Sequence, residues 1–93
     1  MEAIRSADAT AIRALVARGD VNATEPDGTT ALHWAARLDD LKTLNLLLDA
    51  GAHAKAANRY GVTPLWLASV NGNAATVARL LKAGADANTA VAE

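Results

Sequence analysis

The side chains that could perform acid–base or metal chemistry are few in this sequence, and their spacing does not favour it. The two histidines, His33 and His53, lie about 20 residues apart, and neither has further ligands beside it at the spacing of a metal site. Asp39 and Asp40 are adjacent carboxylates, which suggests general acid–base work. Their position between two predicted helices instead indicates a helix N-cap with a favourable helix dipole.

Nucleophilic and phosphate-binding motifs are equally weak. The only serines are Ser6 and Ser69, no Ser-His-Asp arrangement is suggested, and the chain has no cysteine. Gly28 and Gly61 are isolated turn glycines and do not form a phosphate-binding loop. We therefore expect a chain that is not an enzyme and that uses no cofactor and no metal.

Composition restricts the classes of partner. The chain has 93 residues, which is one domain at most, and its nine Lys or Arg balance ten Asp or Glu. Because no basic stripe is present, we expect no nucleic-acid binding. The apolar runs are far shorter than the roughly 20 residues of a membrane span, and no signal-peptide pattern begins the chain. We expect no membrane association, and the absence of cysteine favours the cytoplasm.

The elements that must position these side chains recur along the sequence. Residues 28–35 and 61–68 share the pattern Gly-x-Thr-(Ala/Pro)-Leu-x-x-Ala, and residues 47–52 and 80–85 share Leu-Leu-x-Ala-Gly-Ala. Both pairs are offset by 33 residues. Residues 12–22 are an earlier, partial copy in which one residue has been lost. A constant period of this size is typical of a repeat protein.

Each unit predicts a turn, a short helix, a connection and a second helix. Thr30 and Thr63 are the expected N-caps of first helices over about 31–38 and 64–70. The second helices are predicted from apolar stripes, which consist of Leu41, Leu44, Leu47 and Leu48, and then Ala74, Val77, Leu80 and Leu81. Gly51 and Gly84 should end these helices as left-handed caps.

These motifs resemble those of the ankyrin repeat family. The family motif Thr-Pro-Leu-His-x-Ala appears as Thr-Ala-Leu-His-Trp-Ala at 30–35 and as Thr-Pro-Leu-Trp-Leu-Ala at 63–68. The family's tail, Leu-Leu-x-x-Gly-Ala-Asp-x-Asn, is matched at 80–88. The resemblance covers residues 3–90. It implies an all-α, helix-turn-helix repeat solenoid with short β-hairpin loops.

The same resemblance divides residues 1–93, taken as one domain, into repeats. It implies a partial repeat at 1–23, full repeats at 24–56 and 57–89, and the start of a further arm at 90–93. The family's structural histidine corresponds to His33, whereas Trp66 takes the equivalent place in the next unit and is interpreted as structural. Ala31, Asp39, His53 and Lys55 also depart from the family pattern, which affects local hydrogen bonds rather than the fold.

In ankyrin-like proteins, the exposed side of the first helices and the hairpin tips line a concave binding surface. Carried over to this chain, that surface predicts a partner-binding patch of Pro26, Asp27, Trp34, Arg37, Leu38, Arg59, Tyr60, Leu67, Val70 and Asn71, with Thr29 and Val62 also at the tips. Trp, Tyr and Arg dominate interface hot spots. The alternative is that Trp34 covers the base of its own hairpin and Tyr60 fills a turn. In either case Trp34 should be more exposed than Leu32 or Leu47.

Three functions remain open. The leading one is non-catalytic recognition of a protein partner of unknown identity. The alternative is a structural building block that self-associates end to end through its uncapped faces, at Ile4, Ile12, Val77 and Leu81. A third is a targeting module attached to an enzyme in a longer parent chain, and we expect that the sequence is a piece of such a longer repeat array.

Overall fold

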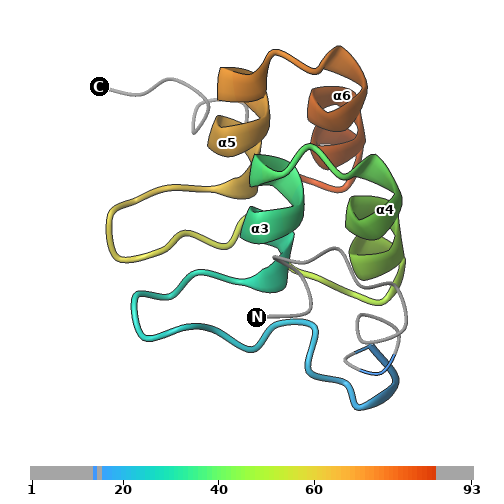
Figure 1. Cartoon of the computed structure of the whole chain (residues 1–93), viewed down its shortest axis with the longest axis vertical. Helices are drawn as coiled ribbons and strands as arrows, with labels where there is room; N and C mark the ends of the chain where they lie inside the picture. Colours follow the sequence, from blue (N-terminus) through green and yellow to red (C-terminus); the bar gives the residue numbers. More distant parts are fainter. Residues whose placement is uncertain (1–13, 15, 86–93) are drawn as a thin grey trace.

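Two pairs of helices make up the described part of the chain. The computed structural model describes residues 14 and 16–85 (Figure 1). The helices of this part are α3 (Ala31–Arg37), α4 (Leu41–Asp49), α5 (Pro64–Asn71) and α6 (Ala74–Lys82). The first helices, α3 and α5, lie side by side in one layer, with α4 and α6 in a second layer (Figure 1). The all-α repeat fold indicated by the sequence is confirmed.

The predicted capping side chains begin each first helix. The Thr30 hydroxyl accepts from the backbone N–H of His33 at 3.4 Å, and the Thr63 hydroxyl accepts from that of Trp66 at 3.2 Å. Pro64 occupies the first turn of α5, where its missing N–H costs nothing. These local signals explain why the helices begin where the sequence predicts, at residues 31 and 64.

Asp39 and Asp40 end one helix and begin the next, as the sequence predicts. The Asp40 carboxylate accepts from the backbone N–H of Thr43 at 3.1 Å and from its hydroxyl at 2.6 Å, which caps α4. Asp39 has a φ of +57°, a left-handed conformation in which glycine is the usual residue. Its Oδ1 atom accepts from the Asn73 amide at 2.8 Å, so Asp39 links the end of α3 to the N-cap of α6. Both carboxylates therefore have structural roles.

Two loops project from the N-terminal ends of α3 and α5, on the side away from α4 and α6 (Figure 1). We call residues 24–30 finger 1 and residues 57–63 finger 2. Each finger closes on a three-residue turn, because Glu25 N–H donates to Thr29 O at 2.8 Å and Asn58 N–H donates to Val62 O at 3.0 Å.

The expectation of β-hairpin loops needs one correction. The only β pairing in the described residues is an isolated antiparallel bridge between Thr24 and Thr30, and no strand forms there. The reason is that the residues of each finger that could continue a ladder turn away into the first helix at its N-cap. The fingers are therefore turns stacked on one another rather than strands.

Small side chains from the first helices form the middle of the core. Leu32, Leu44, Leu47, Leu65 and Leu80 are the largest apolar side chains in it and are at most 1% exposed. Ala31, Ala35, Ala36 and Ala68 are each 0% exposed, which allows the two helical layers to approach closely. The buried side of α3 is the one that helical geometry predicts.

The predicted stripe of α6 is only partly buried. Leu80 is buried, Val77 is half-buried, and Ala74 and Leu81 are exposed, Leu81 at 41%. Thr76 is 0% exposed and takes a core position that the stripe did not include. The reason is that the main helix contacts of α6 are with α5 and α4 only, which leaves its other sides less covered.

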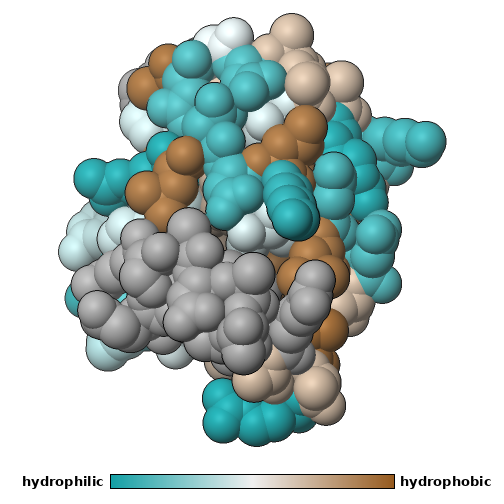
Figure 2. All heavy atoms as spheres, turned by 45° about the vertical axis from the view of Figure 1, so that its right-hand side comes forward, coloured by the Kyte–Doolittle hydropathy of each residue, from teal (hydrophilic) through white to brown (hydrophobic). Residues whose placement is uncertain are grey.

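The side of the molecule formed by α4 and α6 is mixed in character. Figure 2 shows hydrophobic residues there in separate small areas with hydrophilic residues between them, over the part that the described residues form. Arg79 of α6 donates to Asp49 of α4 at 3.0 Å and ties the two helices together on this side. In the described part of the chain, no helix has the length and apolar character that crossing a membrane requires.

Candidate functional site

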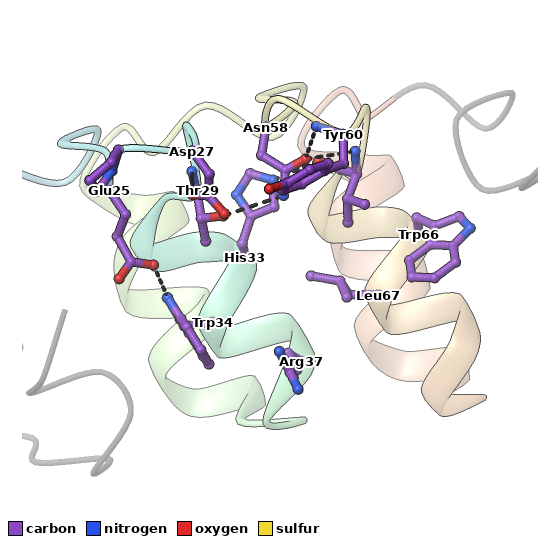
Figure 3. Close-up of a pocket in the computed structure, with 12 residues that line it drawn as sticks. Glu25, Asp27, Thr29, His33, Trp34, Arg37, Asn58, Tyr60, Trp66 and Leu67 are labelled. Atoms are coloured by element: carbon purple, nitrogen blue, oxygen red, sulfur yellow. Dashed lines mark hydrogen bonds between the residues drawn. The ribbon is translucent and has the colours of Figure 1, made fainter.

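A groove of about 490 Å³ lies between the fingers and the first helices (Figure 3). Both fingers and both first helices contribute to its walls. The lining residues are Glu25, Pro26, Asp27 and Thr29 of finger 1, His33, Trp34 and Arg37 of α3, Asn58, Tyr60 and Val62 of finger 2, and Trp66 and Leu67 of α5. Two tryptophans and a tyrosine contribute aromatic surface to the groove, and Glu25, Asp27 and Arg37 contribute charged groups.

The two fingers are held against each other by backbone and side-chain contacts. The backbone N–H of Arg59 donates to Asp27 O at 2.6 Å, and its guanidinium donates to Pro26 O at 3.3 Å. The Asn58 amide donates to the Thr29 hydroxyl at 3.3 Å. Gly28 permits this approach, because a Cβ added there would meet the Cα of Asn58 at 3.2 Å. The tips thus form one continuous wall.

His33 fixes that wall to α3. The backbone N–H of Thr30 donates to Nδ1 of His33 at 3.0 Å, so the proton of the neutral ring lies on Nε2. This Nε2–H donates to Val62 O of finger 2 at 2.8 Å. Burial lowers the pKa of His33 and favours the neutral ring that this arrangement requires. His33 therefore has the structural role that the resemblance implies.

Trp34 stands between its own finger and the open groove. Its indole N–H donates to the Glu25 carboxylate at 2.7 Å, and the guanidinium carbon of Arg37 lies 5.4 Å from the centre of its ring (Figure 3). It is half-buried, whereas Leu32 and Leu47 are fully buried, which confirms the predicted order of exposure. Trp34 both covers the base of finger 1 and lines the groove.

Asp27 supplies a stable negative charge at the tip of finger 1. Hydrogen bonds from the side chain and backbone of Thr29 lower the pKa of the Asp27 carboxyl, and the nearby Arg59 adds to this effect. The backbone bond, from Thr29 N–H to Oδ1, is 2.9 Å long. Asp27 is therefore ionised at neutral pH, while Arg37 carries the opposite charge at the last turn of α3.

The structure brings six of the ten predicted patch residues to the groove and leaves four outside its lining. Those in the lining are Pro26, Asp27, Trp34, Arg37, Tyr60 and Leu67, and those outside are Leu38, Arg59, Val70 and Asn71. Leu38 and Val70 are exposed but do not face the groove. The Asn71 amide instead donates to Ala36 O at 2.8 Å and Arg37 O at 3.1 Å, which joins the end of α5 to that of α3.

Sequence reasoning missed Glu25 and Asn58 as groove residues and gave Trp66 and His33 structural roles only. Glu25 and Asn58 lie 33 residues apart, at the same place in the first arm of each finger. The repeat period itself was thus a signal for this pair. Their contribution arises because the first arm of each finger, and not only its tip, faces the first helices.

Of the four residues predicted to stack end to end with another copy, the structure describes only two. Val77 is half-buried and Leu81 is exposed, whereas Ile4 and Ile12 fall outside the described residues. Self-association, like the division into repeats, stays a prediction. Within residues 14 and 16–85, no group of three or more His, Cys, Asp or Glu side chains is arranged to hold a metal ion.

The chain is similar in sequence to segments of several curated proteins. The chain is 39% identical over 67 residues to palmitoyltransferase AKR1 of Lachancea kluyveri, a match that covers 72% of the chain and 9% of that protein. It is 38% identical over 61 residues to the E3 ubiquitin-protein ligase KEG of Arabidopsis thaliana, covering 66% of the chain and 4% of the ligase. It is 43% identical over 75 residues to the nuclear factor NF-kappa-B p105 subunit of Mus musculus, covering 77% and 8% respectively.

The chain thus spans less than a tenth of the length of each of these three curated relatives. The family model described as ankyrin repeats, in three copies, matches residues 1–90, which is nearly the whole sequence. Together with the paired helices, the stacked fingers and the 33-residue period, this match shows that the chain belongs to the ankyrin repeat family.

Proposed function

We propose that this chain is a non-catalytic module that binds a protein partner in the groove between its fingers and its first helices. Ankyrin repeats generally mediate interactions between proteins. The observation that carries the proposal for this groove is its lining, in which Trp34, Tyr60 and Trp66 contribute to the walls of an open space of about 490 Å³. Aromatic side chains in such a place are the residues that most often dominate binding energy.

Hydrogen bonds hold the walls of the groove together in the chain by itself. The fingers are joined by the backbone bond from Arg59 to Asp27, and the Trp34 ring is fixed by Glu25. A surface that is already ordered loses less conformational entropy on binding than a mobile one. The exposed Tyr60 ring, at 71% exposure, then gains the most from burial against a partner.

The relatives support a role that does not depend on catalysis. Their printed names describe a palmitoyltransferase, a ubiquitin ligase and a nuclear factor subunit, yet the same kind of segment matches all three. A segment shared by proteins of such different names does not explain any one of their activities. We infer that this chain serves as a recognition module, which also fits attachment to a longer protein.

The test compares one variant inside the groove with one outside it. A partner is captured from source cells on the immobilised chain, purified, and titrated against the Tyr60→Ala and Val70→Ala variants. Both residues are exposed, and only Tyr60 lines the groove. We expect Tyr60→Ala to weaken binding by about tenfold or more, as for a hot-spot aromatic, while Val70→Ala leaves it unchanged.

The folded state of both variants is checked by circular dichroism before the titration. Binding that survives Tyr60→Ala unchanged but weakens on Val70→Ala would remove the groove as the site of contact.

A further inference from the structure

The two ends of the groove carry opposite charges, with apolar surface between them. Asp27 stands at the tip of finger 1 and Arg37 at the last turn of α3, and Trp34 and Leu67 lie between them (Figure 3). We propose, on the basis of the function proposed above, that the occupant is an extended protein segment of defined polarity. It places a basic side chain beside Asp27, an apolar one between Trp34 and Leu67, and a carboxylate beside Arg37.

Arg37 is the more selective end of the groove. Its side chain is exposed, its guanidinium lies over the Trp34 ring, and it forms no ion pair with any carboxylate in the described residues. Stacking on an aromatic face leaves the N–H groups at the edge of a guanidinium available, and these match the two oxygens of a carboxylate. Because Trp34 already restricts the side chain, less rotamer entropy is lost on pairing.

The finger end selects against carboxylates. Asp27 is ionised at neutral pH and lines this end of the groove. Arg59, held nearby by its bond to Pro26 O at 3.3 Å, offsets part of this charge from outside the groove lining, whereas Arg37 has no such neighbour among the ion pairs of the described residues. A segment bound in the reverse direction brings like charges together at both ends, which disfavours that orientation.

The same charges favour a protein segment over a nucleic acid. A phosphate backbone repeats its negative charge along its whole length and would meet the carboxylate of Asp27 at one end of the groove. A polypeptide can alternate basic, apolar and acidic side chains over a short extended stretch. The mixed lining therefore fits a peptide segment.

A displayed library of random linear peptides is the probe, selected at neutral pH on the folded chain. Selections are run on the wild-type chain, on Arg37→Glu, and on Lys42→Glu as a matched charge reversal on the exposed side of α4. We expect wild type and Lys42→Glu to enrich peptides that have a basic residue on one side of an apolar residue and an acidic residue on the other. Arg37→Glu should lose the preference for the acidic residue and gain one for a second basic residue.

Affinities of one selected peptide then give the size of the effect. We expect Arg37→Gln to weaken its binding about tenfold, the scale of one hydrogen-bonded charge, and added salt to reduce that difference. Asp27→Asn keeps the oxygen that caps Thr29 and removes only the charge, so it should relax the preference for a basic residue.

The outcomes separate the two proposals. Peptides that bind wild type and Arg37→Glu equally well, or that carry no charge pattern, overturn the polarity and leave the groove as a protein-binding site. Selected peptides are also tested on Tyr60→Ala, which should weaken the binding of any peptide that occupies the groove. If no selected peptide binds Tyr60→Ala more weakly than wild type, both proposals are overturned.

Discussion

Replacing His33 by alanine tests how the binding wall is attached to the helices. The ring is 1% exposed and joins two parts of the chain, through the bond from Thr30 N–H to Nδ1 at 3.0 Å and the bond from Nε2–H to Val62 O at 2.8 Å. The Thr30 hydroxyl also lies 2.8 Å from Nδ1. His33→Ala removes these contacts and leaves the buried backbone N–H of Thr30 without its partner, whereas Val62 O keeps the bond from Asn58 N–H at 3.0 Å.

The expected loss follows from these contacts. A net hydrogen bond contributes about 1 kcal/mol, and a buried polar group left unpaired costs about 1–3 kcal/mol. With the volume of the ring also lost, we expect His33→Ala to lower the free energy of unfolding by about 3–4 kcal/mol. A domain of this length has a total stability of about 5–14 kcal/mol. The variant should therefore fold, but with much of its stability gone.

His53→Ala is the matched control for this measurement. His53 is exposed, and the contact it makes with Asn22 uses its backbone N–H, at 2.8 Å, which alanine retains. Urea unfolding of both variants should show a clear loss for His33→Ala and a change within about 0.5 kcal/mol for His53→Ala. Equal transition midpoints for the two variants would refute the role assigned to His33.

The same side chain predicts a pH dependence. Because burial lowers the pKa of folded His33 below the ordinary 6.5, the unfolded chain binds a proton there more readily. The contribution of His33 is fully present above pH 6.5 and is lost as the pH falls from there through the folded pKa. The difference in unfolding free energy between wild type and His33→Ala should therefore shrink on acidification below pH 6.5. A difference that stays constant or grows would contradict this sign.

Three further substitutions, one of them a control, test the contacts between units. Gly28 and Gly61 both have positive φ, at +87° and +76°, so alanine at either position should lower the free energy of unfolding by about 1 kcal/mol. Gly28→Ala should cost more than Gly61→Ala, because only at Gly28 does the new Cβ meet the backbone of Asn58. Thermal unfolding of the two variants compares them directly, and equal losses would contradict the close approach of the fingers. Asn71→Ala should cost about 1–2 kcal/mol because it removes the bonds from the Asn71 amide to Ala36 O and Arg37 O, and it should not change partner affinity. A weaker affinity in a still-folded variant would return Asn71 to the binding patch.

The parts of the fold that depend on nearby residues were predictable from the sequence. Thr30 and Thr63 cap helices that begin one residue later, and Asp40 caps the next helix. These caps could be predicted because each capping bond joins residues only three positions apart. The buried side of α3 followed from helical geometry alone. The same geometry placed Trp34 on a less buried side, and the structure confirms it.

The groove was harder to predict because it depends on how neighbouring units meet. Helical geometry places Val70 and Asn71 on the side of Leu67, but it does not show that the Asn71 amide reaches across to α3 or that Val70 lies outside the lining of the groove. Glu25 enters the groove through its bond to Trp34, nine positions along the chain. Likewise, the exposure of Leu81 depends on what packs against α6, which the apolar stripe does not indicate.

The most direct test of partner binding in the groove uses the two tryptophans of the chain, Trp34 and Trp66, as reporters. Both line the groove, and each indole N–H gives a separate signal in a ¹H–¹⁵N spectrum. On adding the purified partner, we predict that both indole signals and the backbone amide of Tyr60 shift, while the amide of Lys42 on α4 stays in place. Shifts confined to α4 and α6, with both indole signals unchanged, would contradict the account.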